Sequence, residues 1–356
     1  MIDIATQSIH PLLAFGLALG ISALGIFILL HLPKKQLVWD IPDRANAMHT
    51  SPTPRMGGLM MTTAVALTLL VFSNGGLPKV LIMTAAILIL VSLCDDRWQL
   101  SPGLRLATHL AAATLVTLFW VRSFVFSSPA DSTWIWLSSP LGIVIGILAI
   151  TWMTNLYNFM DGADGLAGGM AAFGFGSYAL IAYNTQTQDA AGMALLSAAL
   201  AGASVGFLVF NFPAAKIFMG DAGSIPLGFL AAVLGIQGIF IGIWRWWFPI
   251  IVFSPFIVDA SITLIKRIGA HKKIWHAHRE HYYQQLILSG WTHRRTAMAY
   301  YLVMFGASSS ALIVQIRESG NPQVLTEGVI LVTWVVIYGL LLCILERRFT
   351  NNKNEK

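Results

Sequence analysis

Long apolar runs separated by short polar segments repeat along the whole chain. None of these runs alternates with the period of two expected of strands, and each is long enough, or nearly so, for a helix across roughly 30 Å of hydrocarbon. Lipid offers the backbone no hydrogen-bonding partner, so helices are the spanning element that we expect. The pattern predicts an all-α polytopic membrane protein with about 11 transmembrane helices, at residues 11–32, 57–73, 78–94, 104–121, 140–154, 168–183, 190–210, 225–243, 246–265, 296–316 and 324–345.

The composition agrees with this pattern. Hydrophobic residues make up 56% of the 356 residues and charged residues 11%, whereas an average soluble domain carries roughly 25% charged residues. So few charges cannot cover the surface of a soluble chain of this length, which excludes a soluble globular fold. Two Cys and 31 Gly without a period also exclude a disulfide scaffold and a collagen-like chain. We therefore expect residues 1–356 to form a single integral membrane domain.

The basic residues predict the orientation of the helices. No Lys or Arg precedes the first apolar run, and Lys34 and Lys35 follow it, which favours a retained helix over a secretory signal. With the N-terminus outside, all but four of the 22 Lys and Arg residues fall on the inner side. This asymmetry predicts a multi-pass membrane protein with its N-terminus outside. Attraction to anionic lipid head groups accounts for the net charge of +6 without nucleic acid.

Polar residues of catalytic type gather on the same inner side. Carboxylates, imidazoles, amides and glycines are concentrated there, while the outer loops are short and poor in such groups. This concentration indicates an active site at the cytoplasmic ends of the helices. The predicted catalytic loops are at about 33–56, 95–103, 155–167, 211–224 and 266–295.

Two adjacent carboxylates, Asp95 and Asp96, end the third apolar run. Their mutual repulsion near a low-dielectric region raises the pKa of at least one unless a cation is close. A metal ion, a magnesium-bound phosphate or a basic partner would supply that cation. The alternative is an ordinary solvated helix end.

A second polar segment follows the fifth run. Asn155, Asn158 and Asp161 are spaced by three and share a face if the helix continues, and Asp164 follows a turn that glycine permits. These side chains supply the oxygen ligands that magnesium prefers, together with donors and acceptors for a base edge. The alternative is a polar turn with glycine caps.

A third segment precedes the eighth run and reads Gly-Asp-Ala-Gly-Ser at residues 220–224. It brings Asp221 together with the free N–H groups of a helix start, where a metal and a phosphate can bind. Lys216 lies five residues earlier and can reach a phosphate oxygen. Asp221 could instead merely cap the helix.

The longest inner loop carries His276, His278, Arg279 and His281. This pattern packs donors that can bind phosphate from several angles. Zinc is the competing interpretation. Hard oxygen ligands in the other loops, and the lack of Cys in this one, favour magnesium with phosphate.

Together with Pro42-Asp43-Arg44 and the run from Pro52 to Gly58, these motifs carry a family resemblance. From residue 40 to about 295, the chain resembles the polyprenyl-phosphate N-acetylhexosamine-1-phosphate transferases, the glycosyltransferase 4 family. The resemblance implies a Mg²⁺-dependent phosphoglycosyltransferase, with Mn²⁺ as a substitute metal. Such an enzyme transfers an amino-sugar 1-phosphate from a UDP-sugar to undecaprenyl phosphate at the cytoplasmic face and releases UMP.

The resemblance also implies roles for individual residues. Asp95 and Asp96 match the family's paired catalytic aspartates, while Asp221, with Asn155, matches its metal site. The implied donor-binding residues are Asn158, Asp161, Asp164, Asn211, Lys216, His276, His278, Arg279, His281 and Arg55. The expected partners are the UDP-amino-sugar, undecaprenyl phosphate and membrane lipid, with no nucleic acid; a homodimer stays open.

Two departures narrow the substrate. Gln99 stands where the phospho-MurNAc-pentapeptide transferases of peptidoglycan synthesis usually carry Lys, and the histidines are not consecutive. We therefore expect an enzyme closest to those that initiate O-antigen or common antigen, using UDP-GlcNAc, UDP-FucNAc or UDP-QuiNAc, with the pentapeptide transferase as the alternative. A lipid or sugar-phosphate transporter is disfavoured because only Asp259, Glu327 and His109 lie clearly inside spans and no repeat is visible.

Overall fold

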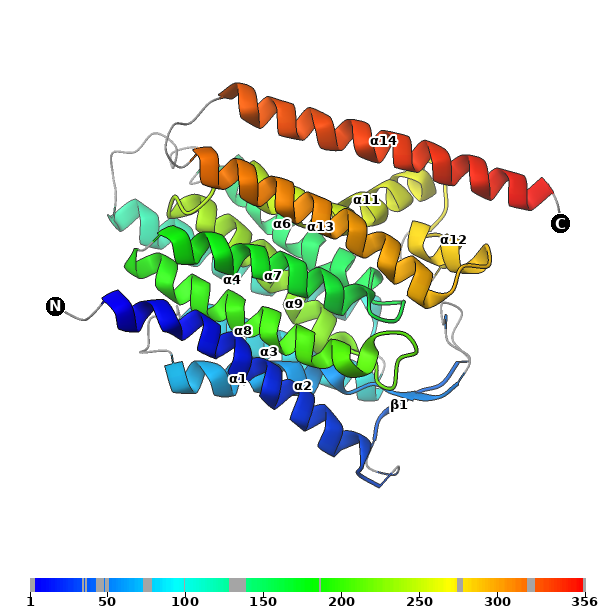
Figure 1. The fold of residues 1–356 in the computed structure, drawn as a ribbon, viewed down its shortest axis with the longest axis horizontal. Coiled ribbons are helices and arrows are strands. Elements are labelled where there is room, and N and C mark those ends of the chain that lie inside the picture. The colour runs from blue at the N-terminus through cyan, green and yellow to red at the C-terminus, as the bar shows by residue number, and fades with distance from the viewer. Residues whose placement is uncertain are drawn as a thin grey trace.

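The protein is a bundle of helices with one small two-stranded sheet at its end (Figure 1). The computed structural model describes residues 4–33, 35, 37–42, 48, 51–72, 79–98, 100–127, 139–185, 187–273, 278–318 and 324–354. Its helices are α1 Ile4–Leu30, α2 Gly57–Phe72, α3 Lys79–Trp98, α4 Pro102–Ser127, α6 Pro140–Phe159, α7 Leu166–Thr185, α8 Gln188–Asn211, α9 Asp221–Phe240, α10 Trp247–Val252, α11 Ser254–Gly269, α12 Tyr282–Leu288, α13 His293–Glu318 and α14 Val324–Asn354. Strands β1 Trp39–Asp40 and β2 Thr53–Pro54 pair antiparallel.

The predicted all-α membrane class is confirmed. Eight helices within the described residues are long and apolar enough to cross a membrane. They are α1, α4, α6, α7, α8, α9, α13 and α14. The chain is therefore a multi-pass membrane protein.

The number of spans stays a prediction, because three of the eleven expected spans have a different character. Helix α2 has only 16 residues, and α3 includes charged residues at both ends. The expected span 246–265 is not one helix: α10 and α11 meet at Phe253. Pro255 lies in the first turn of α11, where its missing N–H costs nothing, so the sequence permits a new helix to begin there.

Helices α8 and α9 form the centre of the bundle. The apolar stretch of each is 78% buried, against 11% for α14, which lies along one edge of the molecule (Figure 1). Helices α1 and α7 pack against α8, and α6 and α3 pack against α9. The start of α9, which carries Asp221, is thus held by its neighbours on several sides.

The loops of interest lie at one end of the bundle. Figure 1 places β1, α12 and the last turns of α14 at this end, and the start of α1 at the opposite end. Termini at opposite ends agree with an odd number of crossings. The orientation in a membrane stays a prediction.

Candidate active site

Three buried carboxylates meet at this end of the bundle. Asp95 and Asp96 lie in the last turn of α3, and Asp221 is the first residue of α9. The Arg55 guanidinium lies 2.5 Å from Asp221 and 3.3 Å from Asp96. That of Arg105 lies 3.1 Å from Asp95 and 3.7 Å from Asp221. We call Asp95, Asp96 and Asp221 the carboxylate cluster, and Arg55 and Arg105 the arginine pair.

The arginine pair offsets a strong repulsion. Asp95 and Asp221 are within hydrogen-bonding reach of each other, and their side chains are only 8% and 9% exposed. Like charges this close in a buried site disfavour ionisation unless cations are near. Burial alone would lower the pKa of Arg55, but Asp221 and Asp96 raise it above its ordinary value, so the guanidinium stays charged.

Backbone pairing brings Arg55 to the carboxylate cluster. The Gly57 N–H donates to Phe218 O at 2.9 Å, the Gly58 N–H to Met219 O at 2.8 Å, and the Phe218 N–H to Pro54 O at 2.8 Å. The pairing requires glycine, because a methyl group at Gly58 would lie 2.3 Å from the Gly223 nitrogen. The segment before α2 is thereby fixed against the segment before α9.

The amides of α6 divide between two sites. The Asn158 amide donates to Asp221 Oδ1 at 3.0 Å and to Ser224 Oγ at 2.9 Å. Asn155 lies one turn earlier, where its amide donates to Thr151 O and its Oδ1 is 3.3 Å from His109 Nδ1. The structure therefore places Asn158 beside Asp221, and pairs Asn155, the expected metal ligand, with a histidine of α4.

Asp161 follows α6 in a turn beside the carboxylate cluster. Burial raises the pKa of Asp161 well above its usual range, although Arg55 acts in the opposite direction. A bound cation would favour its ionised form.

Asp164 and Asn211 hold two turns together. Asp164 Oδ2 accepts the Ala215 N–H at 3.0 Å, and Asn211 Oδ1 accepts the Gly165 N–H at 2.8 Å. The Asn211 amide also donates to Ile217 O. These contacts fix the turn after α6 to the segment before α9. Donor binding by either side chain stays a prediction.

The loop with His278, Arg279 and His281, which we call the histidine loop, borders the turn after α6. Phe159 lies beside the His281 ring, and the Tyr283 hydroxyl donates to Phe159 O at 3.0 Å. His278 stacks on His281 with ring centroids 4.9 Å apart. Burial, and then His281, lower the pKa of His278 to about 4, so this imidazole is neutral at neutral pH.

The remaining predicted residues lie around this centre. Arg279 is partly exposed on the histidine loop, and Lys216 is exposed on the segment between α8 and α9. His276 lies outside the described residues, as do Asp43, Arg44 and Gln99.

Several site residues escaped prediction from the sequence. Arg105 was only one of many inner basic residues, and Ser224 was only the last residue of the Gly-Asp-Ala-Gly-Ser motif. His293 Nδ1 accepts the Asp164 N–H at 3.2 Å. Asp259 accepts the Tyr282 and Tyr283 N–H groups at 2.9 and 3.1 Å, and so anchors the start of α12. The position of Arg105, ten residues after Asp95 in the first turn of α4, was the available signal.

The donor set suits a magnesium ion bound partly by substrate. Within the described part of the chain, no three His, Cys, Asp or Glu side chains form a ready-made chelate. Mg²⁺ in phosphoryl-transfer sites commonly uses one or two carboxylates, with phosphate oxygens and water completing the shell. Asp95 and Asp221, as close buried carboxylates beside the Asn158 amide, fit that mode.

Comparison with known proteins gives consistent relatives. The model of glycosyl transferase family 4 matches residues 78–239. A Bacillus subtilis probable undecaprenyl-phosphate N-acetylglucosaminyl 1-phosphate transferase is 30% identical over 75% of each chain. A Mycobacterium leprae decaprenyl-phosphate N-acetylglucosaminephosphotransferase is 28% identical over 83% of this chain and 81% of its own. An Anoxybacillus flavithermus phospho-N-acetylmuramoyl-pentapeptide-transferase is 29% identical over 71% of this chain and 81% of its own.

The first prediction concerns the close approach at Gly58. A Gly58→Ala substitution is expected to lower the free energy of unfolding by about 1–3 kcal/mol, because its methyl group would meet the backbone of Gly223 and Met219, which cannot rotate away. Thermal unfolding of the detergent-purified protein, followed by tryptophan fluorescence, measures the loss. Gly103→Ala is the control, since the space there is open. Equal melting temperatures for the two variants would contradict the close approach.

The second prediction concerns the arginine pair. Arg55→Met is expected to cost about 3–5 kcal/mol of stability because it leaves buried carboxylates uncompensated. Its cost should be smaller in an Asp221→Asn background, where one of those charges is gone. Chemical unfolding of the two single variants and the double variant gives the coupling between the sites.

A second ion pair serves as the control. Arg245 lies 3.2 Å from Glu327 and is 44% exposed, so Arg245→Met should cost only about 0–1 kcal/mol. Strict additivity of Arg55→Met and Asp221→Asn would show that the two groups do not interact.

Proposed function

The chain belongs to the polyprenyl-phosphate N-acetylhexosamine-1-phosphate transferases of glycosyl transferase family 4, and on that premise we propose that it transfers N-acetylglucosamine 1-phosphate, or a 6-deoxy analogue, from a UDP-sugar to undecaprenyl phosphate. The products are UMP and a lipid-linked amino sugar. We place the reaction at the cytoplasmic face of the bacterial inner membrane, and its product at the start of an O-antigen-type glycan.

The observation that carries this proposal is the meeting of the arginine pair and the carboxylate cluster at the helix ends. Arg55 and Arg105 present fixed positive charge beside Asp95, Asp96 and Asp221. Positive charge of this kind binds a phosphate anion. It matters more when a second phosphate attacks a nucleotide diphosphate, because two anions must then approach each other. A site built from two guanidinium groups and three carboxylates can bind phosphates and share a divalent cation with them.

The chemistry requires little proton transfer. A phosphate monoester has a second pKa near 6 and is mostly a dianion at pH 7, so it can attack the donor diphosphate without a general base. The barrier is the approach of two anions, together with the charge on the departing UMP. Arg55 and Arg105 are placed to hold the reacting phosphates and to offset that repulsion.

We assign Mg²⁺ to the carboxylate cluster, with Asp221 and Asp95 as its protein ligands and Asn158 beside Asp221. When bound, Mg²⁺ would neutralise diphosphate charge and stabilise the leaving group. The arginine pair offsets two of the three negative charges of the carboxylate cluster.

The structure favours direct in-line attack over a phospho-aspartate intermediate. Asp95 Oδ1 accepts the Leu100 N–H at 2.7 Å, and its Oδ2 lies 3.1 Å from Arg105. Arg55 lies against Asp96. Carboxylates that are hydrogen-bonded and ion-paired in this way are poor nucleophiles, and they are well placed to position other groups.

We place the donor between the turn after α6 and the histidine loop. Asn158 at the end of α6 and Asp161 in the turn lie on the first side, and His281 lies beside Phe159 on the second. In this assignment Arg279 and Lys216 add positive charge for the donor phosphates. Relatives named for N-acetylglucosamine support UDP-GlcNAc as the first donor to test.

The third prediction tests the reaction and its donor. Purified enzyme with undecaprenyl phosphate and Mg²⁺ is offered UDP-GlcNAc, UDP-FucNAc, UDP-QuiNAc and UDP-MurNAc-pentapeptide, and UMP release is measured. We expect UMP from at least one of the first three donors and none from UDP-MurNAc-pentapeptide. The reason is that Gln99 and the non-consecutive histidines differ from the pattern of the pentapeptide transferases. Omitting undecaprenyl phosphate is the control. No UMP from any donor would overturn the proposed function.

The fourth prediction separates the two mechanisms. Enzyme is incubated with donor labelled in the β-phosphate and without acceptor, then denatured and examined for labelled protein. Direct attack predicts no labelled protein and no UMP, since no nucleophile is present. Stoichiometric label that Asp95→Asn or Asp96→Asn removes would instead establish a phospho-aspartate.

A further inference from the structure

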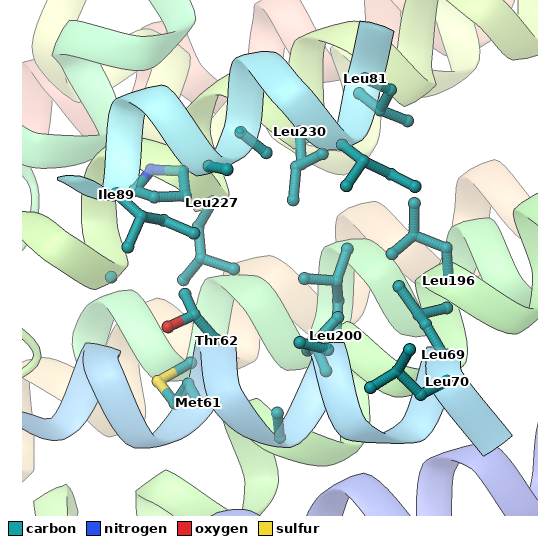
Figure 2. Close-up of a pocket in the computed structure, with 18 residues that line it drawn as sticks. Met61, Thr62, Leu69, Leu70, Leu81, Ile89, Leu196, Leu200, Leu227 and Leu230 are labelled. Carbon is teal, nitrogen blue, oxygen red and sulfur yellow. The ribbon is translucent and has the colours of Figure 1, made fainter. Parts of the chain in front are cut away.

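The interior of the helix bundle is largely apolar, and the Asp259 carboxylate is an exception. The cavity between α2, α3, α8 and α9 shows the usual pattern, since Thr62 is the only polar side chain among the described residues that line it (Figure 2). Asp259 lies in the second turn of α11 and is buried. A buried carboxylate is costly unless hydrogen-bond donors and a cation surround it. The surroundings of Asp259 therefore indicate its use.

Hydrogen-bond donors from three helices surround the Asp259 carboxylate. Its Oδ1 accepts the Tyr282 N–H at 2.9 Å and the Thr263 hydroxyl at 3.3 Å. Its Oδ2 accepts the Tyr283 N–H at 3.1 Å and the Tyr300 hydroxyl at 2.5 Å. The carboxylate therefore holds the start of α12 against both α11 and α13.

His281 supplies the basic partner of Asp259. Its Nδ1 lies 3.5 Å from Asp259 Oδ1, and both side chains are 3% exposed. Lys266 and Arg267, the basic residues of α11, pair with other carboxylates. A carboxylate beside an imidazole orients the ring and favours the tautomer with a proton on the nitrogen that faces it. Asp259 therefore sets the orientation of the His281 ring.

The His281 ring in turn supports the histidine loop. The rings of His278 and Tyr283 stack on it, with centroids 4.9 and 5.9 Å away. His281 is buried, whereas His278 is partly exposed, so a donor from the cytosol meets His278 first. The exposed imidazole is thus held by a buried one.

Tyr283 links the same carboxylate to the turn after α6. Asp259 accepts the Tyr283 N–H, and the Tyr283 hydroxyl donates to Phe159 O, at the end of α6, at 3.0 Å. A methyl group at Gly162 would overlap that hydroxyl, so the turn packs directly on Tyr283. Asp259 is therefore connected to both sides of the space in which we place the donor.

We propose that Asp259 is a positioning residue for the UDP-sugar donor. Through His281 and Tyr283 it sets how the histidine loop faces the turn after α6. The inference rests on the proposed function, and it gives control of donor binding to a residue outside the carboxylate cluster. The acceptor phosphate, placed at the arginine pair, is not held by these contacts. Loss of the Asp259 carboxylate should therefore affect the donor and spare the acceptor.

An isosteric substitution tests this role. Asp259→Asn keeps the shape of the side chain, but an amide nitrogen cannot accept the N–H and O–H groups that face both carboxylate oxygens. We expect the KM for the UDP-sugar that the wild type uses to rise about tenfold, because misplacing a positioning group by the order of 1 Å can cost up to about 10²-fold. The KM for undecaprenyl phosphate should not change. UMP release with each substrate varied in turn measures both values.

Glu346→Gln is the matched control. Glu346 of α14 accepts the Tyr282 hydroxyl at 2.7 Å, so this change also weakens the support of α12 but leaves Asp259 and His281 intact. We expect its donor KM to equal that of the wild type. A rise as large as in Asp259→Asn would show that any loosening of α12 has this effect, and would overturn the role of Asp259.

A second variant decides the matter if Asp259→Asn does not fold. Tyr300→Phe keeps the carboxylate and removes one of its donors, and we expect the donor KM to rise about threefold, as for the loss of one hydrogen bond. An unchanged donor KM in Tyr300→Phe would then overturn the proposal.

The path through His281 has its own test. Asp259→Asn should raise the donor KM less in a His281→Gln background than in the wild type, because the two groups act together. Equal increments in both backgrounds, or an equal rise of donor and acceptor KM, would contradict the proposal. Absence of UMP release by the wild type overturns the proposed function. Normal UMP release with an unchanged donor KM in a folded Asp259→Asn protein overturns the positioning role alone.

Discussion

The fold of the site depends on holding three carboxylates together at the edge of an apolar bundle. Asp95, Asp96 and Asp221 come from two helices that are distant in sequence, and their repulsion in a buried setting would drive them apart. Arg55 and Arg105 supply the opposing charge from two further elements. The ends of α2, α3, α4 and α9 are thus tied into one charged centre, and every other contact of the site surrounds it.

Short-range geometry makes this centre rigid. The backbone pairing of Gly57 and Gly58 with Phe218 and Met219 fixes Arg55. The contacts of Asn211 and Asp164 fix the adjoining turn. Preorganised charge of this kind is effective in phosphoryl transfer because the protein need not reorganise when charge develops.

The sequence was sufficient for the helical class and for the residues of the carboxylate cluster. Polar residues at the ends of apolar runs stand out, because lipid tolerates few of them. The sequence could not show which arginine pairs with which aspartate. Arg105 looked like any other basic residue of the inner loops. The closeness of Arg55 to Asp221 depends on the contact between Gly58 and Gly223, which are far apart in the sequence. The break between α10 and α11 was hidden by a continuous apolar run.

We propose that the carboxylate cluster serves catalysis rather than stability. The turnover number of Asp221→Asn, measured by UMP release at saturating donor and acceptor, tests this proposal. We expect it to fall by at least about 10²–10³-fold, in a protein whose thermal unfolding is no less cooperative than that of the wild type. Turnover near the wild-type value, in a correctly folded Asp221→Asn protein, would contradict it.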